Sequence, residues 1–269
     1  MIQKLIISAP FGNYISFPHA TSTIGTFTLK KRGGRLYRLY RIARTLRPYP
    51  RLKSWSNKLG LPNPGIDVIK GKNLGGKIIS IHGFTHADWC QLTEKVHDLP
   101  AVYPEAVELN VSCPNVRDEI EGLKWYREIF ARAKQNIPSN VSIIVKLPPV
   151  NWERLFGVAY DEVGIKYFHC CNTLPVPSGG LSGKALKPAS LEVINRISEK
   201  LQGDDGEDDH LLRIIGGGGI TNINDLEDYK KAGADYFAVG SAFLNPFRHR
   251  GLKKMAKYLT TADHLLTKE

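Results

Sequence analysis

One cysteine stands where a thiol could do chemistry. Cys113 lies in the segment ELNVSCPN, where a short apolar run typical of a β-strand is followed at once by proline and asparagine. A proline at that point ends the strand, so we expect the thiol in a loop, where it could act as a base or a nucleophile. Most free cysteines are instead small buried hydrophobic residues. We apply that interpretation to the other three, Cys90, Cys170 and Cys171.

Three glycine-rich segments have the composition of a phosphate site. They are GGLSG at 179–183, GGGG at 216–219 and VGSA at 239–242. Glycines let backbone N–H groups approach an anion closely. The alternative is that these glycines only turn tight corners. We predict a phosphate cradle formed by Gly183, Gly218, Gly219, Gly240 and Ser241.

A set of asparagines suits a flat, neutral, amide-rich ring, because each side chain offers a donor and an acceptor in one plane. Asn110 and Asn115 flank Cys113, and Asn172 precedes Thr173. Asn57, in SNKLGLPN, could reach the same space from an excursion of the chain. Any single asparagine could instead cap a turn, but several that converge on one site favour a ligand.

One lysine ends a strand-like run. In IIVKL, Lys146 follows three apolar residues. A charge at the end of a buried strand is costly unless it faces an opposite charge or an electron-rich partner. We therefore include Lys146 in the candidate site.

The elements that must position these residues alternate between strands and helices. Repeated βα units indicate a parallel sheet, and eight of them close into a (β/α)8 TIM barrel, whose functional residues follow the carboxyl ends of the strands. The motifs above all follow such ends. The predicted strands are Leu5–Ala9, Thr23–Thr28, Ile78–His82, Val107–Val111, Ile143–Leu147, Tyr167–Cys171, Arg213–Gly216 and Tyr236–Val239. The predicted helices include Leu123–Gln135, Trp152–Val163, Leu191–Leu201, Ile223–Ala232 and Leu252–Leu266.

Two connections break this alternation. Only about a dozen residues separate the first two strands, so the first helix is expected to be missing or reduced to a turn. The interval 29–77 is too long for one helix and is expected to cross the barrel mouth. Residues 1–269 are otherwise expected to form a single domain, since a TIM barrel uses about 250 residues.

Composition and charge narrow the class of protein. No apolar run approaches the ~20 residues of a membrane span. The cysteines show no metal spacing, and the N-terminus lacks the features of a signal peptide, so a reducing cytoplasmic location is expected. The net charge is +11, yet residues 30–53 hold ten Lys/Arg and no acid.

The basic segment predicts an inserted amphipathic helix over residues 34–47. On a helix, Arg35, Arg38, Arg41 and Arg44 form one arc. The opposite arc is apolar, so the helix could dock by its apolar face or meet an anionic surface such as a membrane or a nucleic acid. The apolar arc consists of Leu36, Leu39, Tyr40, Ile42, Ala43 and Leu46.

The motifs resemble those of a known family. ELNVSCPN is similar to the hallmark segment of dihydroorotate dehydrogenases, in the form of the class that uses a cysteine base. SNKLGLPNPGID, IIVKLPP, NT followed by GGLSG, and IIGGGGI followed by AVGSA resemble its other motifs, in the same order. The resemblance covers nearly the whole chain and implies an FMN-dependent TIM barrel.

The resemblance also implies roles for individual residues. Cys113 would take a proton from one substrate carbon while hydride passes from its neighbour to FMN. The implied reaction is oxidation of a CH–CH bond. The implied substrate is dihydroorotate, which would become orotate in pyrimidine biosynthesis, or a related small cyclic compound. The implied cofactor site is Ala9, Asn110, Lys146, Gly183, Gly218, Gly219, Gly240 and Ser241. The implied site for a pyrimidine-like substrate is Asn57, Leu59, Gly60, Leu61, Asn110, Asn115, Asn172 and Thr173.

One position departs from the family pattern, because Gly25 stands where the family has a lysine. Two alternatives stay open. One is a tRNA-dihydrouridine synthase-like flavoenzyme, which also places a cysteine in an Asn-x-x-Cys-Pro segment of an FMN barrel. The other is a degenerate barrel that binds FMN or a phosphate ligand without turnover. The expected partners are the small-molecule substrate, an anionic surface met by residues 34–47, and a second copy in a homodimer.

Overall fold

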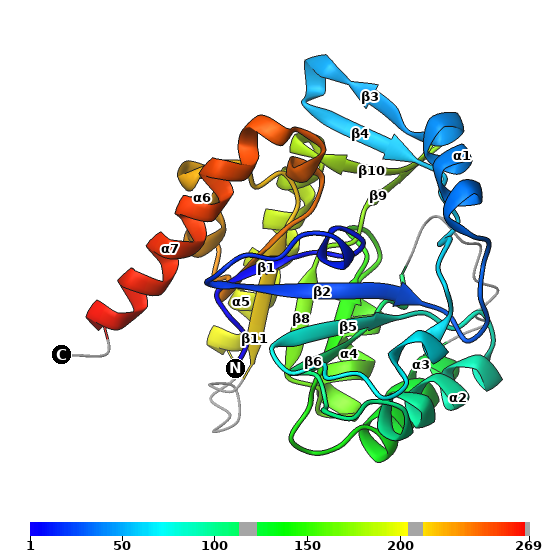
Figure 1. The fold of residues 1–269 in the computed structure, drawn as a ribbon. Helices are drawn as coiled ribbons and strands as arrows, with labels where there is room; N and C mark the ends of the chain where they lie inside the picture. Colours follow the sequence, from blue (N-terminus) through cyan, green and yellow to red (C-terminus); the bar gives the residue numbers. More distant parts are fainter. Residues whose placement is uncertain (113–122, 204–211, 267–269) are drawn as a thin grey trace.

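A closed barrel of eight parallel strands forms the centre of the computed structural model, which describes residues 1–112, 123–203 and 212–266 (Figure 1). The strands follow one another around the barrel in the order β1-β12-β11-β8-β7-β6-β5-β2. This confirms the predicted TIM barrel. The strands are β1 (Leu5–Ile7), β2 (Ala20–Phe27), β5 (Lys77–Ile81), β6 (Ala106–Leu109), β7 (Ser142–Leu147), β8 (Tyr167–Cys170), β11 (Arg213–Gly217) and β12 (Tyr236–Val239).

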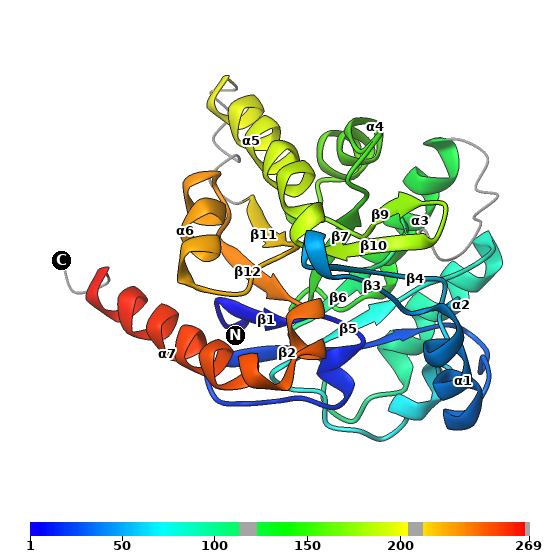
Figure 2. The same cartoon turned by 90° about the horizontal axis from the view of Figure 1, so that it is seen from above.

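Helices between the strands surround this barrel (Figure 2). As expected, only the short 3-10 turn Phe11–Asn13 lies between β1 and β2. Helix α2 was not predicted, and Thr85 caps it by accepting a hydrogen bond from the Asp88 N–H at 3.1 Å. The helices are α2 (His86–Asp98), α3 (Leu123–Asn136), α4 (Glu153–Gly157, continued by the π-helix Val158–Glu162), α5 (Lys187–Gly203), α6 (Ile223–Lys231) and α7 (His249–Leu266).

None of the helices within the described ranges is both long and apolar enough to cross a membrane.

A second, antiparallel sheet lies over one end of the barrel (Figures 1 and 2). Its strand order is β3-β4-β10-β9, so the interval after β2 pairs with the interval after β8. The GGLSG segment, predicted as a phosphate loop, is itself strand β10. The strands are β3 (Arg47–Tyr49), β4 (Ser54–Asn57), β9 (Leu174–Val176) and β10 (Gly179–Gly183).

The predicted inserted helix is present as α1 (Arg35–Thr45), beside β4. The helix does not dock through the whole of its predicted apolar arc. Leu36, Leu39 and Tyr40 are exposed. Arg38 instead donates to the Tyr14 hydroxyl, and Arg41 donates to backbone carbonyls of the β4 end. Guanidinium groups find acceptors there that leucine side chains could not use, which accounts for the inward arginines.

The barrel interior changes from apolar to polar along the strands. Its lower layer is a separate apolar cluster, with Ile78 of β5, Ala106 of β6 and Ile144 of β7 among its members. Side chains two residues apart in a strand point the same way. The next layer toward the carboxyl ends therefore contains Ser80, Glu108, Lys146 and His169.

Candidate active site

A cavity of about 920 Å³ opens between the barrel and the second sheet. Most of the predicted site residues lie in its wall, although they come from eight different segments of the chain. The cavity joins the carboxyl ends of the barrel strands to β4 and β10. The predicted residues in its wall are Ala9, Asn57, Leu59, Leu61, Asn110, Lys146, Asn172, Thr173, Gly183, Gly218, Gly219, Gly240 and Ser241.

Three predicted residues are not placed there. Cys113 and Asn115 lie outside the described residues. Gly60 is not part of the cavity wall; a Cβ atom on it would be 3.9 Å from the Arg41 guanidinium. The side-chain oxygen of Asn57 accepts from the Leu59 N–H at 3.4 Å, so this asparagine also has the turn-capping role that was the alternative.

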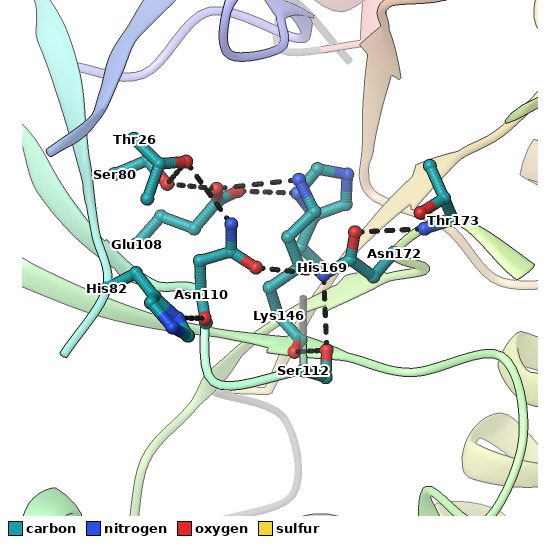
Figure 3. A network of polar contacts seen from close by, with 10 residues as sticks. All are labelled: Thr26, Ser80, His82, Glu108, Asn110, Ser112, Lys146, His169, Asn172 and Thr173. Atoms are coloured by element: carbon teal, nitrogen blue, oxygen red, sulfur yellow. Dashed lines mark hydrogen bonds and ion pairs between the residues drawn. The ribbon is translucent and has the colours of Figure 1, made fainter. Parts of the chain in front are cut away.

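A carboxylate is buried at the centre of the polar layer, beneath the cavity (Figure 3). Glu108 Oε2 lies 2.6 Å from His169 Nδ1. Its other oxygen, Oε1, accepts from Ser80 Oγ at 2.8 Å and lies 3.5 Å from Lys146 Nζ. Lys146 and His169 are partners in the β7–β8 register, and Ser80 and Glu108 are partners in the β5–β6 register. The parallel pairing of four successive strands thus assembles this group.

The surroundings set the charges of the group. Burial by itself would raise the pKa of Glu108, but Lys146, His169 and Ser80 outweigh it and lower that pKa to about 2. Burial lowers the pKa of His169, Lys146 lowers it further, and Glu108 only partly opposes them. At neutral pH the centre therefore contains an anionic Glu108, a cationic Lys146 and a neutral His169. A neutral imidazole that donates from Nδ1 to the carboxylate leaves Nε2 as an acceptor.

Amides and hydroxyls form a second polar group beside this centre, at the carboxyl ends of the strands (Figure 3). Asn172 Nδ2 donates to Asn110 Oδ1 at 2.8 Å, which brings two of the predicted asparagines into direct contact. Asn110 Nδ2 donates to Thr26 Oγ1 at 3.2 Å, and Ser112 Oγ donates to the Lys146 carbonyl at 2.7 Å. The Thr173 hydroxyl is buried and has no partner among the described residues. Such an atom in a cavity wall is free to bond a ligand.

The glycines divide into two groups with different roles. A Cβ atom on Gly216 would lie 2.5 Å from the Tyr229 ring, and one on Gly217 would lie 2.9 Å from His169 Nε2, so these two allow close packing. Gly218 and Gly219 have φ values of +115° and +71° and line the cavity. A Cβ atom on Gly219 would lie 2.9 Å from the Gly183 carbonyl oxygen. The backbone at this corner is therefore bare, as a phosphate cradle requires.

An aspartate connects the loops of this corner. Asp225 Oδ2 accepts from the Thr221 N–H at 2.9 Å and hydroxyl at 2.8 Å. Oδ1 accepts from Lys187 Nζ at 2.8 Å and also from Lys184. Burial alone would raise the pKa of Asp225, but these partners hold it well below its usual range. The carboxylate thus holds the loop after β10 against the loop after β11.

The position of the missing family lysine has no room for a side chain. Gly25 lies in the cavity wall with φ +103°. A Cβ atom there would lie 2.4 Å from the Ser80 carbonyl oxygen. In the described part of the cavity wall near Glu108, Lys146 supplies the cationic charge.

The central partners of Lys146 are not among the residues that the sequence motifs predict for the site. They are Glu108, His169 and Ser80, although a glutamate and a histidine within apolar strands are a signal that period-two alternation could have used. In AVELN, the glutamate shares a face with Ala106 and Asn110.

The interpretation of Cys170 as a small buried hydrophobic residue agrees with its burial, which raises the pKa of that thiol.

Comparisons with known proteins match this architecture. The family model described as "Dihydroorotate dehydrogenase" matches residues 19–257. A dihydroorotate dehydrogenase B (NAD(+)) catalytic subunit from Oceanobacillus iheyensis is 31% identical over 239 residues, covering 74% of this chain and 72% of the relative. One from Latilactobacillus sakei is 32% identical over 220 residues, covering 71% and 67%.

A solved structure shares the fold. The crystal structure of DHODH from Eimeria tenella in complex with ferulenol superposes with a TM-score of 0.68 and 18% identity, covering 96% of this chain and 82% of that one. At 18% identity this similarity supports only the barrel fold. The family match spans most of the chain and confirms the resemblance of the motifs. The chain belongs to the dihydroorotate dehydrogenase family of flavin-dependent oxidoreductases.

Proposed function

We propose that this protein is an FMN-dependent oxidoreductase that oxidises dihydroorotate to orotate in pyrimidine biosynthesis. One observation carries the proposal: a bare glycine corner and a cluster of amides line the same cavity, above a buried lysine. The first feature suits a phosphate, the second a flat amide-rich ring, and the third an electron-rich ring edge. The names of the curated relatives agree with this substrate.

The residues present fit FMN. The bare backbone at Gly218 and Gly219, with Gly183, Gly240 and Ser241, would hold the phosphate. Lys146 would face the polar edge of the isoalloxazine, with Ala9 and Asn110 also in contact. When bound, FMN supplies a two-electron acceptor of hydride. Glu108 Oε1 lies 3.5 Å from the ammonium of Lys146 and would keep it in place for this contact.

Amide groups would bind the substrate. Asn172 Nδ2 donates to Asn110 Oδ1 at 2.8 Å and to Ser112 Oγ at 3.4 Å, and Asn110 Nδ2 donates to Thr26. These bonds leave one amide hydrogen of Asn110 for a ligand. The Asn172 carbonyl oxygen is partly used by the Thr173 N–H, at 2.9 Å. The Thr173 hydroxyl supplies a further group for the ring substituents of a pyrimidine. Asn57, Leu59, Gly60, Leu61 and Asn115 complete the proposed substrate site.

Cys113 would provide the base. Its thiolate would take a proton from one substrate carbon, and FMN, when bound, would supply the acceptor for hydride from the neighbouring carbon, so that a C=C bond would form and the electrons balance. The thiolate is the basic and reactive form of cysteine. Ser112, next to Cys113, donates its hydroxyl to the Lys146 carbonyl and so fixes the start of this loop.

A cytoplasmic location and a homodimer complete the proposal. The cytoplasm keeps free thiols reduced, which suits the free cysteines Cys90, Cys170 and Cys171.

The visible spectrum of the purified protein, followed by anaerobic addition of dihydroorotate, tests the proposal. Flavin absorbance at isolation, bleached by dihydroorotate, is the expected result. A colourless protein that cannot be loaded with FMN would show that FMN is not the cofactor. A yellow protein that dihydroorotate does not bleach would show that dihydroorotate is not the substrate. The family match does not favour either a tRNA-dihydrouridine synthase or a barrel without turnover.

A further inference from the structure

Large apolar side chains project from the outer side of helix α1. Leu36 is 83% exposed, Leu39 62% and Tyr40 54%, and Tyr37 is exposed as well. Figures 1 and 2 both show α1 at the periphery of the molecule, next to β3 and β4. Soluble monomers rarely gather such side chains on one element unless that surface binds something. We call Leu36, Tyr37, Leu39, Tyr40 and Arg44 the α1 face.

Specific contacts fix this outward orientation. Arg38 stacks over the Tyr14 ring at 4.9 Å and donates to its hydroxyl. Arg41 donates to the carbonyls of Lys58 and Leu59. A rotation of the helix that buried the leucines would break these bonds. The leucines are therefore exposed because the arginines are anchored.

The α1 face belongs to a segment that is rich in exposed basic side chains. Arg44 lies over the Tyr40 ring at 6.0 Å, and Arg47, Arg51 and Lys53 follow it, all exposed. No acid occurs in the whole of residues 30–53. The charged side chains of this segment thus all have one sign of charge, which is complementary to a polyanion.

We propose that the α1 face binds the surface of an anionic lipid bilayer. An amphipathic helix lying in the membrane interface buries leucines at the acyl boundary, places tyrosines at headgroup level and directs arginines to lipid phosphates. Helix α1 presents these three kinds of side chain together on one side. Its 11 residues span about 16 Å, so the contact is peripheral and this helix is too short to cross the membrane.

Other occupants fit less well. A nucleic acid would use the arginines and could stack on the tyrosines, but it gives Leu36 and Leu39 nothing to bind. A second copy meeting the same face by two-fold symmetry would place arginines against arginines. Anionic lipid matches both the apolar side chains and their charge.

Flotation of the full-length protein with lipid vesicles tests the proposal. Wild-type protein is expected to float with vesicles of phosphatidylcholine mixed with phosphatidylglycerol, and about tenfold less with phosphatidylcholine alone, because each nearby arginine is attracted by the anionic surface. Leu36→Ser with Leu39→Ser should lose binding at unchanged net charge. Ile223→Ser, an exposed apolar residue on α6, is the matched control and should float like wild type.

A second comparison of variants tests how much the positive charge contributes to lipid binding. Arg44→Gln with Arg47→Gln should weaken flotation and its dependence on salt, whereas Lys230→Gln with Lys231→Gln on α6 should not. Circular dichroism checks that each variant folds. The proposal is overturned if wild-type protein stays with the unbound fraction at low salt, or if the leucine variant floats like wild type. Retention of a single-stranded oligonucleotide without flotation would overturn it as well.

Discussion

Glu108 Oε2 and His169 Nδ1 lie 2.6 Å apart inside the barrel, and both side chains are almost fully buried. Lys146 approaches the other carboxylate oxygen from the neighbouring strand. A lone buried carboxylate would tend to be protonated, but here one cation and two hydrogen-bond donors keep it ionised. The base of the cavity therefore contains an ionised carboxylate that its neighbours hold in a fixed position.

Removal of the central charge should destabilise the protein. Glu108→Gln leaves the Lys146 ammonium buried without its counter-charge, and breaking a buried pair in this way costs about 3 kcal/mol in the free energy of unfolding. Urea denaturation measures the loss. Glu153→Gln, which breaks the half-exposed pair with Arg196, is the control and should cost less than about 1 kcal/mol. Equal losses in the two variants would show that the Glu108 charge has no special role.

His169 should make stability depend on pH. Its folded pKa lies below the ordinary 6.5, so the unfolded chain binds the proton more readily. Stability should then fall as the pH drops below about 6.5, by at most about 1.4 kcal/mol per pH unit for this one group. The Glu108 pKa is lowered from 4.5 to about 2, so its stabilisation is present above about pH 4.5 and lost below that pH.

The window between pH 6.5 and 5 therefore isolates the histidine. His169→Gln should flatten the decline in the free energy of unfolding across that window, measured by urea denaturation at several pH values. His97→Gln, at an exposed position on α2, should leave the slope as in wild type. An unchanged slope for His169→Gln would mean that this imidazole does not control acid stability.

The glycine corner should be required for FMN. Gly219→Ala introduces a Cβ atom 2.9 Å from the Gly183 carbonyl oxygen, and the required movement would push the two loops of the cradle apart. Gly71→Ala is a matched control, because Gly71 has a similar φ of +67° but nothing within 4 Å of its added Cβ atom. Fluorescence titration of apoprotein with FMN should show affinity at least about tenfold weaker for the first variant only. Equal affinities would mean that the phosphate binds elsewhere.

Cys113 should control the reductive half-reaction and not binding. Cys113→Ala is expected to retain FMN and substrate while slowing reduction of the bound flavin by the ~10²–10⁴ typical of a lost general base. Anaerobic stopped-flow absorbance measures this rate. Cys90→Ala, at a half-buried position of α2, should behave like wild type. A Cys113→Ala rate equal to wild type would exclude the thiol as the base.

Local sequence determined much of this protein. Strand ends marked by Asn110, Lys146 and Asn172 could be recognised because turn residues and apolar periodicity act over a few neighbours. The barrel then followed from eight predicted strands, most of them followed by a helix, and it brings the carboxyl ends of parallel strands to one face. The basic helix was also visible in the sequence, because arginines recur at its period.

Tertiary structure alone decided how these pieces meet. The pairing of Glu108 with His169 joins residues 61 positions apart and depends on which strands are neighbours and in which register. The sheet of β3, β4, β10 and β9 likewise joins two segments that are distant in the sequence, so no local sequence pattern could predict it. The inward side of α1 depended on acceptors supplied by Tyr14 and Lys58, in other segments. Periodicity shows that a helix has two faces, but only the surface it packs against selects which one is buried.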